Sequence, residues 1–218
     1  MRRYAVEQIS KLSDDKMSLF MIQFAQAILY EEQHLSPLAE TLIERSLKNP
    51  CVVGASFFWA LKSNLHMKPS YERYSILLEQ FLLLCGKFKE ELSIQCKVNN
   101  ILAQVSQKIS DLKNVENQPW DKIKEAAKIF LSRARKHLPL LFTFTGEPKV
   151  VISDFNYEKF TVFSSKKIPL KITGINQQPG GDPIVTIFKN GDDLRQDILT
   201  MQMLYLMDKI WLDNELDM

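Results

Sequence analysis

Two charged residues near the carboxy-terminus are the strongest candidates for chemistry. Lys189 alternates with Ile187, so both side chains should face the same side of a predicted strand. A tight turn is expected at Asn190, and Asp197 falls about one turn into the helix expected next. Kinase folds hold nucleotide phosphates with a strand lysine that an acid of the next helix keeps in place. An ordinary surface lysine and a helix-terminal acid have the same pattern, and spacing alone favours that simpler interpretation.

No second catalytic or metal-binding pattern accompanies this pair. The cysteines lack CxxC spacing, which favours buried free thiols in a reducing compartment over a disulfide framework or a zinc site. No spacing joins the histidines to a metal site or a nucleophile, so we expect packing or surface roles for them. The residues in question are Cys51, Cys85, Cys96, His34, His66 and His137.

The charge balance and the hydropathy exclude several classes of protein. With 28 basic and 26 acidic residues, the net charge of +2 argues against nucleic acid as a partner. A hydrophobic content of 45% suits a folded globular chain rather than a disordered one. No apolar run approaches the roughly 20 residues that span a bilayer. The amino-terminus also lacks a secretory signal, so we expect a cytoplasmic chain without a transmembrane segment.

The glycines divide the chain into two parts. Residues 1–145 contain only Gly54 and Gly86, and the other five of the 7 glycines follow. Sparse glycine with long apolar periods predicts an array of stacked helical pairs over residues 1–115. Ser36 and Ser70 are expected to cap two of its helices. The expected helices cover residues 17–32, 37–47, 51–65, 70–84 and 98–112.

The second part begins after a linker predicted at residues 114–119. Residues 120–138 predict a helix with a basic face, for which contact with solvent is favoured over contact with an anionic membrane. The pattern then changes to a period of two, and Asp192 and Asp193 should cap a final helix. The basic residues are Lys122, Lys124, Lys128, Arg133, Arg135 and Lys136, and the expected strands cover residues 140–144, 149–153, 160–164, 170–175 and 184–189.

Several segments together resemble one family. Residues 188–197, which read Phe-Lys-Asn-Gly-Asp-Asp-Leu-Arg-Gln-Asp, closely resemble the phosphoinositide 3-kinases, as do the segments that continue them. Residues 164–170, Ser-Ser-Lys-Lys-Ile-Pro-Leu, resemble the family's phosphate-binding loop and the strand after it. Phosphoinositide 4-kinases and the large related protein kinases match these segments less well. The continuing segments are 200–203 and 207–211, and those similar to the family's helical domain are 3–6, 12–15, 42–47 and 57–63.

This resemblance implies roles for particular residues. Lys189 would contact the ATP phosphates, Asp197 would order Lys189, and Ile187 would touch the adenine. One departure is Lys171, which stands where the family often has a tryptophan wall of the adenine pocket. The loop over the phosphates would contain Ser165, Lys166 and Lys167.

The printed residues do not include every part of such a kinase. The family's catalytic Asp-Arg-His…Asn loop and magnesium-binding Asp-Phe-Gly would follow Lys189, and neither occurs in the 218 residues. We therefore expect no catalytic residue and no metal ligand here, with the carboxy-terminal lobe absent. The chain alone is accordingly predicted to be inactive as a lipid kinase.

The predicted fold is α+β. A helical-pair, α-solenoid-like array over residues 1–115 forms part of a helical accessory domain. An incomplete kinase-like amino-terminal lobe with an antiparallel sheet follows over residues 120–218.

The resemblance implies that the parent protein transfers the ATP γ-phosphoryl group to the 3-hydroxyl of a phosphoinositide. Its cofactors would be ATP and Mg²⁺, and its partners a phosphoinositide lipid at a membrane surface and a regulatory subunit. The protein would be cytoplasmic and recruited peripherally to membranes. Three alternatives stay open: a non-catalytic interaction or regulatory module, an incomplete gene product, and another phosphoinositide or related kinase class.

Overall fold

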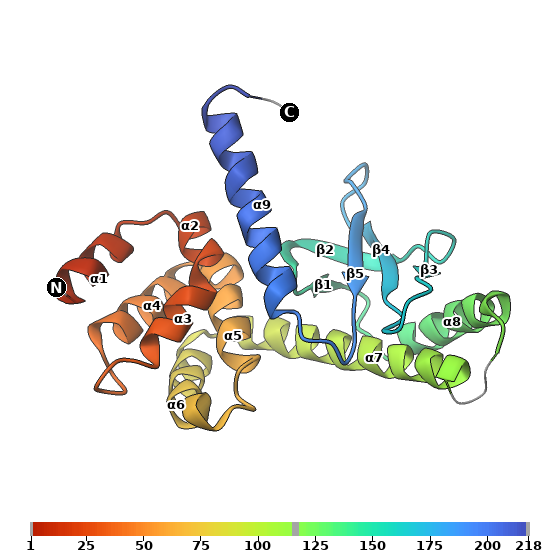
Figure 1. The fold of residues 1–218 in the computed structure, drawn as a ribbon, viewed down its shortest axis with the longest axis horizontal. Helices are drawn as coiled ribbons and strands as arrows, with labels where there is room; N and C mark the ends of the chain where they lie inside the picture. The colour runs from red at the N-terminus through yellow and green to blue at the C-terminus, as the bar shows by residue number, and fades with distance from the viewer. Residues whose placement is uncertain (1, 115–117, 217–218) are drawn as a thin grey trace.

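The computed structural model describes residues 2–114 and 118–216. Its architecture is α+β, as predicted: helices come first, and a five-stranded antiparallel sheet and a last helix follow (Figure 1). The helices of the first part are α1 (Arg2–Ser10), α2 (Asp14–Leu19), α3 (Met21–Ile28), α4 (Pro37–Lys48), the π-turn η1 (Pro50–Gly54), α5 (Ala55–Lys62) and α6 (Lys68–Leu84). The remaining elements are α7 (Phe88–Asn114), α8 (Trp120–Arg135), β1 (Phe142–Phe144), β2 (Glu147–Phe155), β3 (Thr161–Val162), β4 (Leu170–Asn176), β5 (Ile184–Phe188) and α9 (Arg195–Asp213).

Some of the helix caps and helix bounds predicted for the first part are confirmed, and others are wrong. The hydroxyl of Ser36 accepts the N–H of Ala39 at 3.2 Å, which confirms the predicted cap of α4. The predicted cap at Ser70 is wrong, because α6 already begins at Lys68. Ser70 lies in the first turn of α6, and its hydroxyl donates to the carbonyl of Asn64 at 2.7 Å. The single helix expected over residues 17–32 is divided into α2 and α3.

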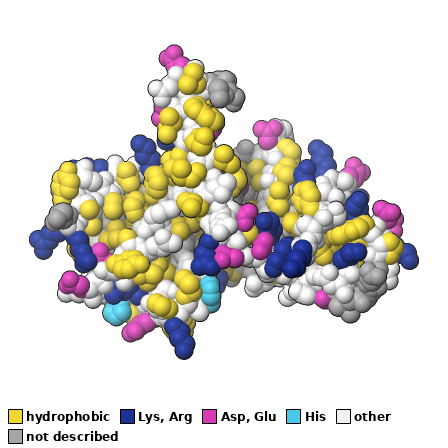
Figure 2. Space-filling model, in the orientation of Figure 1, with side chains coloured by type: hydrophobic (Ala, Val, Ile, Leu, Met, Phe, Trp, Pro, Cys, Tyr) yellow, Lys and Arg dark blue, Asp and Glu magenta, His cyan; other side chains and the backbone are white. Residues whose placement is uncertain are grey.

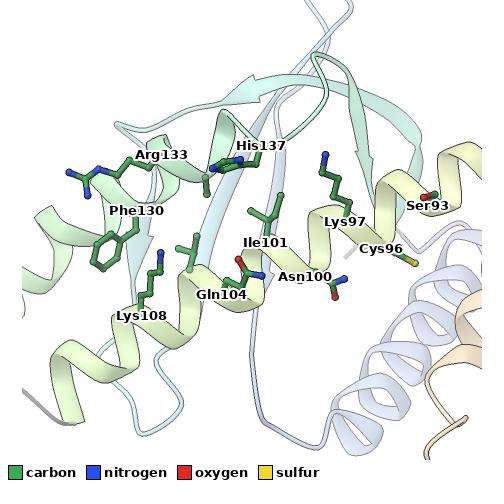
Figure 3. Close-up of a pocket in the computed structure, with 12 residues that line it drawn as sticks. Ser93, Cys96, Lys97, Asn100, Ile101, Gln104, Lys108, Phe130, Arg133 and His137 are labelled. Carbon is green, nitrogen blue, oxygen red and sulfur yellow. The ribbon is translucent and has the colours of Figure 1, made fainter.

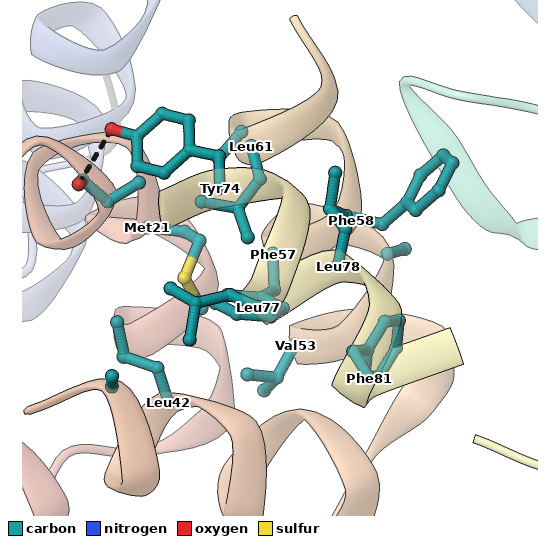
Figure 4. Close-up of a cluster of buried hydrophobic side chains, with 14 of the residues drawn as sticks. Met21, Leu42, Val53, Phe57, Phe58, Leu61, Tyr74, Leu77, Leu78 and Phe81 are labelled. Atoms are coloured by element: carbon teal, nitrogen blue, oxygen red, sulfur yellow. Dashed lines mark hydrogen bonds between the residues drawn. The ribbon is translucent and has the colours of Figure 1, made fainter. Parts of the chain in front are cut away.

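A continuous apolar core holds the first part together (Figure 4). The rings of Phe57 and Phe81 meet edge to face, with centroids 5.7 Å apart, and both are fully buried. Gly54 allows this approach, since an added Cβ would lie 2.9 Å from the Phe81 ring. The hydroxyl of buried Tyr74 donates to the carbonyl of Ala25 at 2.8 Å, so α6 is tied to α3.

The sheet packs against α7 and α8. Its strand order is β1-β2-β4-β3, with β5 paired to the other edge of β4. Leu170 and Ile172 of β4 are fully buried in a cluster that includes residues of α7 and α8. All five predicted strands occur, with ends shifted by a few residues.

One member of the predicted basic face proves to be structural. The guanidinium of Arg135 bonds to the carboxylate of Asp154 at 3.0 Å and to the carbonyl of Ser153 at 2.8 Å. Arg135 therefore joins the end of α8 to β2 and does not belong to a solvated basic surface.

The two apolar clusters meet within α7. The first cluster extends to Leu92, and the second begins at Val98. Between them the buried side chain of Gln95 accepts from the indole of Trp59 at 2.8 Å and donates to Thr143 at 2.9 Å. Gln95 thus connects α5 to β1 across the junction. The division at residues 115–120 stays a prediction, and residues 115–117 of the predicted linker lie outside the described residues.

Candidate functional site

The site begins with the exposed face of β4 and β5. Lys171 pairs with Ile187, so these two side chains share one face of the sheet. Val185 lies on the same face, opposite Thr173. Val185 and Ile187 are 56% and 59% exposed, an uncommon state for β-branched residues in a sheet. This face therefore offers an accessible apolar surface directly before Lys189.

The structure brings Lys189 and Asp197 together. The Lys189 ammonium lies 3.3 Å from a carboxylate oxygen of Asp197 and 3.7 Å from one of Asp192. The contact forms because β5 ends at Phe188 and α9 begins at Arg195, so a short turn joins strand and helix. The Lys189 side chain is 30% exposed and can still meet a ligand from solvent. The two carboxylates together exceed its single positive charge, and an incoming anion would share the ammonium with them.

The loop between β3 and β4 approaches the same turn. The ammonium of Lys167 donates to the carbonyl of Gly191, which ties this loop to the turn after Lys189. Ser165 and Lys166 are exposed, and their side chains make no hydrogen bond or ion pair to another described residue. Lys167 is therefore the residue of the predicted phosphate loop that the structure places beside the turn that follows Lys189.

The start of α9 differs from the prediction. Leu194, which has no hydrogen-bonding side chain, is the residue before the helix, so Asp192 and Asp193 are not at the capping position. Asp193 instead accepts the N–H of Arg195 at 3.1 Å and pairs with its guanidinium. The hydrogen bonds from Arg195 lower the pKa of Asp193 to about 2. Asp192 was missed as a neighbour of Lys189, since an acid beside a turn is normally interpreted as a cap.

A second residue missed from the sequence holds α9 in place. The amide of Gln202 donates to the carbonyl of Leu19 at 2.6 Å, and the amide of Gln23 donates to Gln202 at 2.7 Å. Gln202 is buried, although the helix around it is mostly exposed. The only advance signal was one glutamine within an apolar run. Through this contact the helical part fixes the helix that carries Asp197.

Most of α9 is left uncovered by the rest of the described residues. Figure 2 shows hydrophobic side chains along the part of α9 that faces the viewer. A helix that is apolar on all sides is normally a buried helix. The exposed apolar residues are Ile198, Leu199, Met201, Met203, Leu204, Tyr205, Met207, Ile210 and Leu212.

The described residues contain no cluster of three or more His, Cys, Asp or Glu side chains suited to a metal ion. Within residues 2–114 and 118–216, no helix combines the length and the apolar character needed to cross a bilayer.

Comparisons with known proteins point to one family. Residues 1–94 match the phosphoinositide 3-kinase family accessory domain, the PIK domain. The chain is 38% identical over 217 residues to Phosphatidylinositol 3-kinase 1 of Dictyostelium discoideum, covering 100% of this chain and 13% of that protein. It is 36% identical over 220 residues to the human Phosphatidylinositol 4-phosphate 3-kinase C2 domain-containing subunit beta, covering 100% of this chain and 13% of that protein. The chain thus spans a small part of the length of these relatives.

Proposed function

We propose that the chain belongs to the phosphoinositide 3-kinase family and forms the ATP-binding side of a lipid kinase, since residues 1–94 match the family's accessory domain and the whole chain is similar to phosphatidylinositol 3-kinases. The activity proposed for the whole protein is transfer of the ATP γ-phosphoryl group to the 3-hydroxyl of a membrane phosphoinositide. The observation that carries this proposal is the 3.3 Å contact between Lys189 and Asp197 at the end of β5. A strand lysine ordered by an acid of the next helix is the arrangement that kinases use for phosphates.

The chemistry of the donors fits a nucleoside triphosphate. The Lys189 ammonium would offset phosphate charge while Asp197 holds it in position. Ser165 and Lys166 are exposed in the adjacent loop, where a hydroxyl and a second cation suit phosphate oxygens. Lys167 already donates to the carbonyl of Gly191, so it would hold the turn after Lys189 in place and would not contact the phosphates itself.

The apolar face before Lys189 fits a nucleobase. Val185 and Ile187 are two positions apart on β5, so their side chains lie on the same face of the sheet, and both are exposed. A flat aromatic base can bury such side chains and gain the hydrophobic contribution of the covered area. Lys171, across from Ile187, would supply an aliphatic stem at one side of this surface and keep its ammonium in water.

Magnesium would bridge the ATP phosphates and offset their charge. Its protein ligands are proposed to lie outside the described residues, which offer no cluster for a metal. The exposed apolar length of α9 supports a further part of the protein packing on it, in line with the much greater length of the relatives. A regulatory subunit and peripheral recruitment to membranes remain part of the proposal for the whole protein.

Two polypeptides test the proposal. The first is the 218-residue chain, which should show no ATP-dependent phosphorylation of phosphatidylinositol. The second is a chimera in which this chain replaces the matching segment of Phosphatidylinositol 3-kinase 1 of Dictyostelium discoideum, and it should be active. Activity in the isolated chain would contradict the assignment of roles. A folded chimera with no activity would favour the non-catalytic interaction module instead.

A further inference from the structure

A groove of about 670 Å³ lies between α7 and α8 (Figure 3), and Lys189 is not among its lining residues. Residues of α7 from Ser93 to Lys108 form one wall, and residues from Phe130 to His137 form the other. The α7 residues recur at helical spacing, so they make a continuous stripe along that helix. At 1.5 Å per residue, the stripe is about 22 Å long.

Cations line both sides of this groove. The cations are Lys97 and Lys108 of α7 and Arg133 of α8, and His137 lies just beyond the end of α8. None of the lining residues is acidic. Among the described residues, no ion pair involves any of these four side chains. The basic residues are therefore available to an anionic partner on each side of the groove.

Apolar side chains, together with the amides of Asn100 and Gln104, line the groove between the cations. Ile101 and Val105 of α7 and Phe130 and Ala134 of α8 contribute to the lining. In Figure 3 the Phe130 ring extends from α8 toward α7. The Lys108 ammonium lies 5.9 Å from the centre of that ring, so this cation is held at the edge of the floor.

The distribution of charge indicates the shape of the partner. Lys97 and Lys108 are separated by eleven residues, or about 16 Å along α7, so they cannot meet on one phosphate group. A flat membrane would reach the rim of the hollow and leave its floor uncovered. An amphipathic helix fits a groove between two helices, with its apolar stripe on the floor. Acids on both sides of that stripe would meet the cations of α7 and α8.

We propose that the α7–α8 groove is a docking site for an acidic amphipathic helix of a partner protein. The partner would carry apolar residues at helical spacing with Asp or Glu on both sides. The groove is lined by none of the residues proposed to bind ATP, so the docking test does not depend on the proposed kinase activity.

The test uses the 218-residue chain and two synthetic peptides. The first peptide, of about 18 residues, forms a helix about 27 Å long with a leucine stripe and glutamates on both sides. The second has lysines in place of the glutamates. Isothermal titration calorimetry at about 0.1 M salt should show at least tenfold tighter binding of the glutamate peptide. Equal affinity for the two peptides would overturn the proposal.

Variants locate the binding. Lys97→Ala with Lys108→Ala should weaken the glutamate peptide about tenfold, and Phe130→Gln should weaken it similarly. The matched control, Lys122→Ala with Lys124→Ala, removes the same charge from α8 outside the groove and should change affinity less than twofold. Equal losses in the two double variants would indicate a general charge effect and overturn the proposal. Because the lysines are exposed, the double variant should melt like the parent chain and keeps the test decisive if Phe130→Gln fails to fold.

Two further probes address other anions. Vesicles of phosphatidylserine and phosphatidylcholine test a membrane surface, and inositol hexakisphosphate tests a compact polyphosphate. Neither probe should displace the glutamate peptide at concentrations up to ten times that of the peptide. If either binds through Lys97 and Lys108 while the peptide does not, the groove is an anion or lipid site and the proposal is wrong.

Discussion

Replacing Arg135 with alanine should be among the most destabilising single changes outside the apolar core. The side chain is only 15% exposed and reaches five groups of the following segment, the most distant being the carbonyl of Leu138 at 3.4 Å. It donates to the carbonyls of Pro139, Leu140 and Ser153 at 2.9, 3.0 and 2.8 Å and pairs with Asp154 at 3.0 Å. One side chain therefore closes the connection from α8 into β1 and β2.

The magnitude follows from what the substitution leaves unpaired. In the variant, Asp154 would still accept the N–H of Phe155 and the hydroxyl of Tyr157. Its side chain is 46% exposed, so losing Arg135 as its partner adds little to the free-energy cost. Each partly buried carbonyl that loses a donor costs about 1 kcal/mol, whereas the exposed carbonyl of Leu140 can bond to water instead. We expect Arg135→Ala to lower the free energy of unfolding by about 3 kcal/mol, which corresponds to the three partly buried carbonyls of Leu138, Pro139 and Ser153. The melting temperature should fall by roughly 6–12 °C for a chain of this size.

Urea denaturation and thermal melting followed by circular dichroism measure this loss. Lys136→Ala is the matched control, since it removes an adjacent exposed cation and should change the free energy of unfolding by less than about 0.5 kcal/mol. Arg135→Lys should recover only part of the loss, because an ammonium cannot replace a planar fork. If Arg135→Ala melts like Lys136→Ala, the side chain is an ordinary member of a solvated face and the reasoning fails.

Three other predictions concern the helical part and the linker. Tyr74→Phe should cost about 1 kcal/mol in urea denaturation, because the carbonyl of Ala25 loses its donor. Burial raises the pKa of Tyr74 to about 12, so the wild type should lose stability as pH rises above 10, and Tyr74→Phe should lose less. Hydrogen bonds from Arg45 and Asn49 lower the pKa of Asp14, so their stabilisation is present at neutral pH and disappears as pH falls below about 4. A melting profile of Asp14→Asn that follows the wild type through this range would contradict that assignment. Limited proteolysis should cut first within residues 114–119, and first cuts within residues 57–84 would contradict the predicted linker.

Local features of the sequence were sufficient for much of the fold. The period of two in residues 184–189 predicts β5, and Ser36 before Pro37 predicts the start of α4. The approach of Asp197 to Lys189 is similarly local, since a turn of a few residues separates the strand from the helix. Such features depend on neighbours along the chain, which a single sequence displays directly.

Contacts between distant segments could not be predicted in this way. Gln202 meets Gln23 across 179 positions, and nothing in either residue's local sequence specifies the other. Arg135 was assigned to a basic face because helical spacing alone cannot show which lysines and arginines fold back onto a strand. Ser70 was assigned as a cap because serine suits that position, but α6 begins two residues earlier. In each case tertiary packing decided between environments that the local pattern permits equally.

The most direct test of the central claim is steady-state kinetics of the chimera with Lys189→Met. The account predicts that turnover falls about a hundredfold or more, the scale of losing one electrostatic stabiliser in a catalytic cleft. Lys171→Met is the matched control on the same face of the sheet, and its turnover should stay close to the wild type, because methionine keeps an apolar stem opposite Ile187. A Lys189→Met chimera that keeps most of its turnover would show that Lys189 is an ordinary surface lysine and would contradict the claim.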